Sequence, residues 1–468
     1  MELNDRNIRA KFSGAGDFNA RLLRCGKFIL YAYAIDGLVS GGDISDYIIK
    51  PITEHLAADS ISALYTAALE GMVYNAVASP CKDLDDAAVK LVNGFCVVLF
   101  PGAGAIAFEV KTGEKRSISA PDLENTAKGP KDAFVETVRS NTSLVRRHLR
   151  TPDLRLYETQ VGRRSLTNVT VVWIEGITNP EYVARMIRRL SDIDVDGFLA
   201  PSAVEEYITG SRATAFPLLQ YTQRTDRFCK GLLDGRVGVL VDGLPLGYLA
   251  PVDVGYLMDS SEDYSRDFVT ASCIRILRYL ALLIDLLMPA LYIAMTVFHW
   301  ELLPQSWAQV IWQGREAVPF SPVWEILMLL VAFELLQESG IHLPQSVGQS
   351  VSIIGGIVVG TVGVEAGLIS AIALIAVSVA GVCGFVLPNR DLAAAIRFWR
   401  FVLAVLAALM GLWGIGTGCV ILLLRLATLK SLGVPYIVAF EPRLLRRRMK
   451  NEKSRPKRMK TQDDRNQR

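Results

Sequence analysis

The chain of 468 residues is long enough for two or three domains at roughly 150 residues each. Its formal net charge of +3 is nearly neutral, so charge gives no argument for nucleic-acid partners or acidic substrates. Apolar residues make up 51% of the chain, the mean hydropathy is +0.30, and the apolar excess lies after residue 275. This pattern predicts an integral membrane protein with a soluble N-terminal half.

The start of the chain argues against secretion by a cleaved signal peptide, and the cysteines argue against a disulfide-rich or zinc-binding protein. The first residues, MELNDRNIRAKFSG, lack the apolar core of a secretory signal peptide. The seven cysteines are scattered and include no CxxC pair, so we expect neither a disulfide framework nor a zinc site.

The N-terminal half contains a pattern that occurs twice. Tyr31–Gly37 and Thr170–Gly176 are each a short apolar run ending in Ile, an acid and Gly, which is typical of a strand stopped by a turn. Leu91–Gly102 and Leu232–Gly243 each read as a helix end, a glycine cap, a strand and a turn. The two pairs have similar spacing, which predicts two copies of one α/β unit.

The region between the copies is polar and includes an apparent helix over 132–150, which we expect to connect them. The N-terminal half has no GxSxG, Walker loop, HExxH or GxGxxG after a strand. The Asp36-Gly37 and Asp242-Gly243 pairs are accounted for by turn formation. We therefore expect no enzyme activity, no metal and no cofactor.

The C-terminal half contains five apolar segments. The first, Tyr279–Phe298, is long enough to cross a hydrocarbon core of about 30 Å. Arg275 and Arg278 precede it, which places the N-terminal half in the cytoplasm by the positive-inside rule. The later segments are 323–338, 348–367, 368–387 and 401–424, the last read as one clean span.

The tail, residues 443–468, carries twelve Lys or Arg against three acids. It is expected to be cytoplasmic, where it could contact anionic lipid. Two cytoplasmic ends require an even number of crossings, but the apolar pattern indicates five segments. We therefore expect four full crossings and one partial segment, with five crossings as the alternative.

One segment of the membrane half has a stripe of small residues at helical spacing. Its members are Gly348, Ser352, Gly356, Gly360 and Gly363, followed by Glu365. Such a stripe permits close helix packing in lipid. In a symmetric oligomer the same stripe could line a narrow pore, so these six residues are candidates for a pore or gate.

Four acids lie in or beside the apolar segments, namely Asp285, Glu325, Glu334 and Glu338. Exposing such a group to lipid at mid-depth costs at least about 2 kcal/mol, so we expect them to face protein, water or the interface.

These patterns together predict an α/β cytoplasmic region of two duplicated subdomains followed by an α-helical transmembrane domain. The expected divisions are a first α/β subdomain (1–125), a helical connector (126–160), a second α/β subdomain (161–270), the transmembrane domain (271–430) and the basic cytoplasmic tail (431–468).

A set of dispersed motifs makes the chain resemble the GerA family, the A subunits of bacterial spore germinant receptors. Gly129–Phe134, with Glu136, Asn141 and Arg146-Arg147, is similar to one family block. Further similar blocks are Thr222–Asp226, Leu232–Gly243, Glu262–Tyr264, Pro289–Tyr292, Glu334–Pro344 and Gly433–Tyr436. Each block is weak alone, but their order across the chain is specific. Lys131, Thr225 and His342 depart from the usual family residues.

The resemblance implies properties that composition does not show. It implies a multi-pass protein of the spore inner membrane that acts with a permease-like B subunit and a lipoprotein C subunit. It also implies a homo-oligomer working as a ligand-gated cation channel in contact with membrane lipid, without nucleic acid. The alternatives are a stage V sporulation paralogue that amplifies ion release and a secondary transporter. Duplication in the soluble half rather than the membrane half argues against the transporter.

Overall fold

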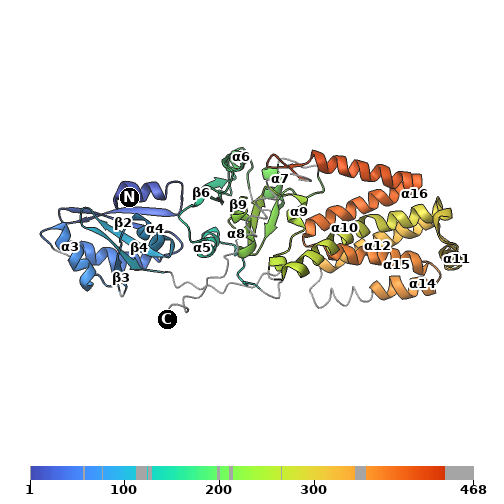
Figure 1. Cartoon of the computed structure of the whole chain (residues 1–468), viewed down its shortest axis with the longest axis horizontal. Coiled ribbons are helices and arrows are strands. Elements are labelled where there is room, and N and C mark those ends of the chain that lie inside the picture. Colours follow the sequence, from blue (N-terminus) through green and yellow to red (C-terminus); the bar gives the residue numbers. More distant parts are fainter. Residues whose placement is uncertain are drawn as a thin grey trace, which may run out of the picture. The chain divides into compact units, whose positions relative to one another are not determined.

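The computed structural model describes residues 2–55, 58–75, 77–111, 124, 129–197, 201–209, 214–264, 266–342 and 355–437. These residues form two compact units (Figure 1). The sheet unit contains 1–211 and 219–251, and the helical unit contains 212–218 and 252–438.

The first sheet of the sheet unit has five strands in the order β1-β2-β4-β5-β3, all antiparallel. The strands are β1 (Phe18–Cys25), β2 (Phe28–Ile35), β3 (Ala78–Pro80), β4 (Phe95–Phe100) and β5 (Gly104–Glu109). The helices around it are α1 (Asp5–Lys11), α2 (Gly41–Asp43), η1 (Ile44–Ile49), η2 (Pro51–His55), α3 (Ile61–Ala67), η3 (Ala68–Met72) and α4 (Leu84–Val92).

The second sheet has the order β6-β7-β9-β10-β8, which is the same order strand for strand. Its strands are β6 (Leu154–Val161), β7 (Thr167–Ile174), β8 (Gln220–Thr222), β9 (Val237–Val241) and β10 (Gly247–Ala250). The expected duplication is therefore confirmed. The sheet begins at Leu154, inside the range expected to be connector. The other helices of this unit are α5 (Val138–His148), α6 (Pro180–Ser191), α7 (Pro201–Thr209) and α8 (Thr225–Leu233).

Strand β4 shows why both faces of the first sheet are covered. Side chains of a strand alternate between its faces, so a strand buried on both sides is apolar throughout. Val97 and Leu99 pack with α1 and α4, whereas Val98 and Phe100 pack with η1, η2 and α3. The result is a sheet between two helical layers.

Helix α5 connects the two sheet subdomains. Arg146 on α5 donates two hydrogen bonds, of 2.8 and 2.7 Å, to the carboxylate of Asp17, and both side chains are 1% exposed. Both Asp-Gly turns also hold α5, since the Ser143 hydroxyl donates to the Gly37 carbonyl and the Val138 N–H donates to Asp242. Gly37 and Gly243 both have positive φ, so the turn interpretation of these pairs is confirmed.

The helical unit consists mainly of apolar helices that run side by side (Figure 1). The elements are α9 (Val254–Leu257), η4 (Ser261–Tyr264), α10 (Phe268–Val297), η5 (Trp300–Leu302), α11 (Gln305–Gln313), α12 (Pro322–His342), η6 (Val358–Val362), α14 (Gly363–Glu365), α15 (Ala371–Phe385), α16 (Arg390–Thr428), β11 (Lys430–Ser431) and β12 (Val434–Pro435). Helices α10 and α16 are long and apolar enough to cross a membrane, each with a mean hydropathy of 2.1 in its most apolar window.

Helix α16 is not one straight helix. Gly411 has φ 58° and ψ −135°, a conformation that breaks it into arms at 390–410 and 412–428. A side chain added at Gly418 would collide with Leu403, fifteen positions earlier, which a straight helix would hold about 22 Å away. The two arms are therefore antiparallel, as Figure 1 shows. The expectation of one clean span over 401–424 is wrong.

Close contacts also give the direction of the helix Gly355–Glu365, which includes η6 and α14. A side chain at Gly355 would meet Leu336, late in α12, whereas one at Gly367 would lie 3.4 Å from the carbonyl oxygen of Ala317, which precedes α12. The helix therefore runs antiparallel to α12.

With the two arms of α16, the described part of the helical unit has six long runs that alternate in direction: α10, α12, Gly355–Glu365, α15 and the two arms. An even number of runs returns the chain to the end where it entered. The Ser431 hydroxyl, beyond α16, accordingly accepts from the Val252 N–H, before α10, at 3.0 Å. The expectation of four crossings plus one partial segment did not include the reversal at Gly411, and the number of membrane crossings stays a prediction.

Candidate functional site

A buried ion pair links α10 to α16 inside the helical unit. Asp285 is 0% exposed and Arg400 is 1% exposed, and Arg400 Nη1 donates to Asp285 Oδ1 at 2.6 Å. A methyl group at Gly384 of α15 would lie 2.9 Å from Asp285 Oδ2, so only glycine leaves room there. The pair thus sits where three apolar helices meet.

Glu334 on α12 extends this pair into a network. Its carboxylate lies 3.9 Å from Arg400 Nη2 and 3.3 Å from Nε of Arg397. Arg397 also donates a short hydrogen bond to Gln337. Two acids and two arginines from three helices therefore balance in charge, with Asp285 and Arg400 buried and Glu334 and Arg397 partly exposed, and this pairing reduces the penalty for placing charges among apolar helices.

A second buried acid lies near the opposite end of α12. Glu325 is 0% exposed, and its Oε2 lies 3.1 Å from Nη1 of Arg315. Its other oxygen accepts from the Ser370 N–H at 2.5 Å. Ser370 caps α15, so Glu325 joins the chain before α12 to the start of α15.

The predicted small-residue stripe is described only in part. Gly348 and Ser352 lie outside the described residues. Gly356 is exposed, and a side chain added there would meet nothing within 4 Å. At Gly360 the nearest atom would be Leu374 Cδ2 at 3.9 Å, whereas Gly363 is buried.

Two predicted acids lie at the surface. Glu365, at the end of α14, is exposed, and so is Glu338 on α12. Glu334, one helical turn before Glu338 on α12, belongs to the network with Arg397 and Arg400.

A third charged cluster joins η4 to the N-terminal part of α10. Arg278 donates to both carboxylate oxygens of Asp263, at 2.6 and 2.9 Å, and Arg275 lies 3.7 Å from the same group. Burial alone would raise the pKa of Asp263, but hydrogen bonds from Arg278 and the Ser260 N–H outweigh it and hold the pKa below its usual value.

The chemistry of these clusters is structural and electrostatic. Each buried acid has an arginine partner, and among the described residues no group of three His, Cys, Asp or Glu could hold a metal ion. Such pairs can hold helices in one arrangement, and their exchange between partners is one way in which helix movements are coupled.

Several residues of these clusters were not identified from the sequence as partners. Arg397 and Arg400 lie one helical turn apart in an apolar helix, which indicates a shared buried face, but their acids are far away in sequence. Arg315 lies in a polar turn and carries no local signal.

Comparisons with known proteins give one consistent result. The model of the family described as "Bacillus/Clostridium GerA spore germination protein" matches residues 6–465. The chain is 35% identical to the "Uncharacterized membrane protein YfkQ" of Bacillus subtilis (strain 168), over 89% of this chain and 80% of that protein. It is 33% identical to "Spore germination protein KA" of the same organism, over 87% of this chain and 75% of that protein. It is 31% identical to "Spore germination protein GerLA" of Bacillus cereus, over 94% of this chain and 87% of that protein.

One solved structure is also similar to part of the chain. It is the N-terminal domain of the A subunit of the Bacillus megaterium spore germinant receptor GerK3, with a TM-score of 0.41 and 27% identity. The match covers 52% of this chain and 91% of that one.

Proposed function

Because the chain belongs to the GerA family of spore germination proteins, we propose that it is an A subunit that forms an oligomeric, ligand-gated cation channel in the spore inner membrane. It would act with a permease-like B subunit and a lipoprotein C subunit. The family consists of germinant-receptor subunits rather than of known enzymes.

The observation that supports a pore between copies is the open face of the helix Gly355–Glu365. At Gly356 the face has no neighbour within the described chain, and Ile357, Val358 and Val362 on the same helix are about half exposed. Small residues on a lipid-facing helix allow close approach to another helix. The buried acids, in contrast, already have arginine partners inside the chain, so they are poorly placed to line a pore.

Adjacent glycines provide a matched test of this proposal. A Cβ added at Gly356 would meet no described atom within 4 Å, so Gly356→Leu should fold normally and fail only where copies meet. Gly355→Leu would collide with Leu336 and should reduce the amount of folded protein. Ile357→Leu, on the exposed surface, should be mild.

The assay is nutrient-triggered cation release from spores, with protein level followed by blotting. We expect Gly356→Leu to block release or to make it constitutive, at a normal protein level. Glu365→Ala should reduce cation release if these exposed carboxylates form a ring. A normal nutrient response from both well-expressed variants would exclude the pore assignment.

The receptor and the stage V paralogue predict different neighbours in the genome. Genes for a permease and a lipoprotein beside this one favour the receptor subunit. Their absence, together with release that depends on another receptor, favours the amplifier.

A further inference from the structure

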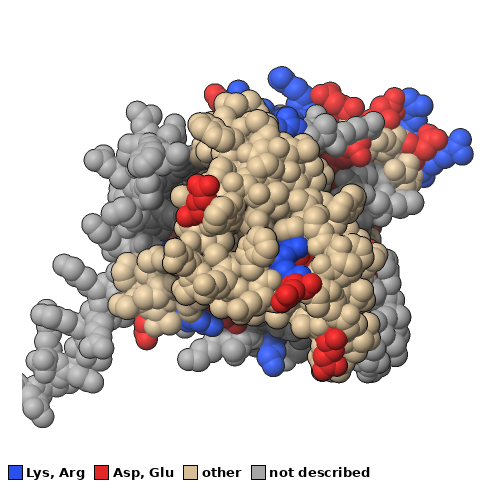
Figure 2. All heavy atoms as spheres, turned by 90° about the vertical axis from the view of Figure 1, so that its right-hand side faces the viewer, with Lys and Arg blue, Asp and Glu red and all other residues tan. Residues whose placement is uncertain are grey.

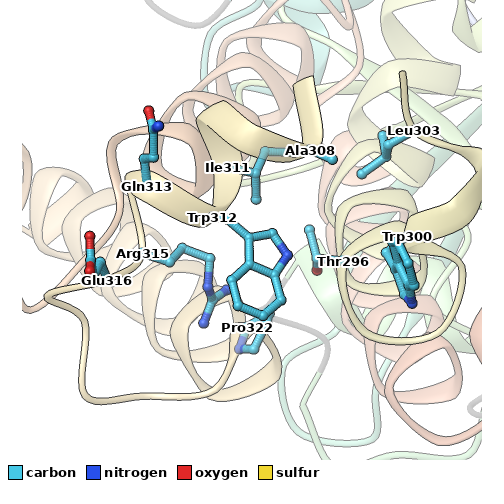
Figure 3. Close-up of a pocket in the computed structure, with 10 residues that line it drawn as sticks. All are labelled: Thr296, Trp300, Leu303, Ala308, Ile311, Trp312, Gln313, Arg315, Glu316 and Pro322. Carbon is cyan, nitrogen blue, oxygen red and sulfur yellow. The ribbon is translucent and has the colours of Figure 1, made fainter. Parts of the chain in front are cut away.

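A cavity of about 600 Å³ opens where α10 ends and α12 begins. Its lining is mainly apolar and aromatic, and includes Thr296, Trp300, Leu303, Ile311, Trp312 and Pro322. In Figure 3 the indoles of Trp312 and Trp300 stand on either side of Thr296, whereas Gln313 and Glu316 lie at the edge. This volume is within the range of ligand pockets in proteins.

The surroundings of the cavity resemble a membrane interface. Trp300 and Trp312, which line the cavity, and Trp307 and Trp324, which are near them in sequence, are all more than half exposed. Exposed tryptophans at the end of apolar helices are typical of the aromatic belt at the level of lipid headgroups. Figure 2 looks onto this end of the helical unit and shows a largely uncharged surface with isolated charged groups.

Two charged residues, Arg315 and Glu316, line the cavity, and Arg315 already has partners within the chain. Arg315 Nη2 donates to the Phe320 carbonyl at 2.9 Å, and Nη1 lies 3.1 Å from Glu325. Of the two charged lining residues, Glu316 lies at the edge of the cavity and Arg315 is engaged with Glu325, so the rest of the lining is mainly apolar and aromatic. An occupant there would bind mainly by burying apolar surface.

We propose that this cavity binds an acyl chain of a membrane lipid, and that its occupancy acts on the gate. The second part rests on the channel function proposed above. Membrane lipid is the apolar ligand that an aromatic belt meets at the highest concentration.

The wall of the cavity is directly connected to the predicted gate segment. Arg315 pairs with Glu325, which accepts from the Ser370 N–H at the start of α15. Two residues beyond Arg315, the Ala317 carbonyl packs on Gly367, which ends the turn after α14. Gly367 has φ +67°, so the turn depends on glycine. A bound acyl chain that displaces Arg315 or Ala317 would therefore displace both ends of the loop between Gly355–Glu365 and α15.

The binding test uses the full chain reconstituted with phosphatidylglycerol that carries brominated or ordinary acyl chains. Bromine quenches nearby tryptophan fluorescence, and the difference between wild type and Trp312→Phe isolates the emission of Trp312. Ala308 lines the cavity, so Ala308→Phe should fill it, with Ala308→Leu as a milder plug. Val310 lies on the same helix, is 58% exposed and does not line the cavity, so Val310→Phe is the matched control.

Because Trp312 is also exposed to the surrounding lipid, we expect its quenching to fall, but not to vanish, in both plugged variants and to stay unchanged in the control. Equal quenching in all variants would mean contact with annular lipid only and would overturn the proposal. The absence of quenching in the wild type would also overturn it.

The coupling test measures cation release from spores carrying the same variants. Ala308→Phe should alter the timing of release, and the added change Glu325→Gln should remove that effect while the quenching pattern stays the same. Unchanged release from the plugged variants would refute the coupling. The lipid-binding proposal and the pore proposal can fail separately. Quenching does not depend on ion conduction, so it tests lipid binding alone. A normal nutrient response from Gly356→Leu would exclude the pore without changing the quenching.

Discussion

Removing one partner of the ion pair between Asp285 and Arg400 should be among the most destabilising single changes in the helical unit. The network of Asp285, Arg400, Glu334 and Arg397 is neutral as a whole, so Asp285→Asn leaves one excess positive charge among apolar helices. Removing one partner of a buried pair typically costs about 3–5 kcal/mol. For a unit of this size that corresponds to a fall in Tm of about 6–20 °C.

A double-mutant cycle separates the pair from other effects of substitution. Arg400→Gln should destabilise by a similar amount, because it leaves Asp285 buried without its partner. The double variant restores neutrality, so it should be more stable than the sum of the single changes predicts, with a coupling of about 1–3 kcal/mol. The measurement is the temperature at which the purified full chain is lost from its size-exclusion peak in detergent.

An exposed ion pair with the same distance between its charged atoms serves as the control. Lys50 and Asp46 also lie 2.6 Å apart, but their side chains are 59% and 57% exposed. Asp46→Asn should leave Tm unchanged, since water and salt screen such pairs. If Asp285→Asn melts like the wild type, or if the cycle is additive, the interpretation of the pair as a clamp between α10 and α16 is wrong.

Three further changes test other parts of the fold. Arg146→Gln leaves Asp17 buried without its two hydrogen bonds, so it should destabilise the sheet unit by about 3–5 kcal/mol, measured by circular dichroism melting. Gly411→Ala forces a side chain into φ +58° and to 2.9 Å from Phe298 Cβ, so it should destabilise the α16 reversal by about 1–3 kcal/mol and lower the amount of folded protein on blots. Asp263 has a lowered pKa in the folded state, so its contribution is complete above the unfolded value of about 3.9 and is lost as the pH falls through the folded value. Melting curves between pH 6 and 3 should therefore show an acid-dependent loss in the wild type that is smaller in Asp263→Asn.

The parts of the fold that the sequence predicts are those with local signals. The strands and turns of both sheets follow from short apolar runs that end in glycine, and Gly37 and Gly243 adopt the positive φ that those turns need. The duplication follows because the same local signals occur twice at similar spacing. The partner of Asp285 has no such signal, since Arg400 lies 115 positions away and only the packing of α10 against α16 brings them together.

Glycine spacing shows most clearly where local pattern stops being informative. Gly411, Gly414 and Gly418 occur at helical spacing in an apolar run, much as Gly356 and Gly360 do. In the first set the glycines allow the second arm of α16 to pack on Leu403 and Leu406 of the first, so the chain itself supplies the partner. In the second set an added side chain at Gly356 meets nothing within 4 Å. Close approach is the main advantage that glycine offers a lipid-facing helix, and it offsets a helix propensity about 1 kcal/mol poorer than that of alanine. The open face of Gly355–Glu365 therefore supports the proposal that this helix contacts another copy of the chain.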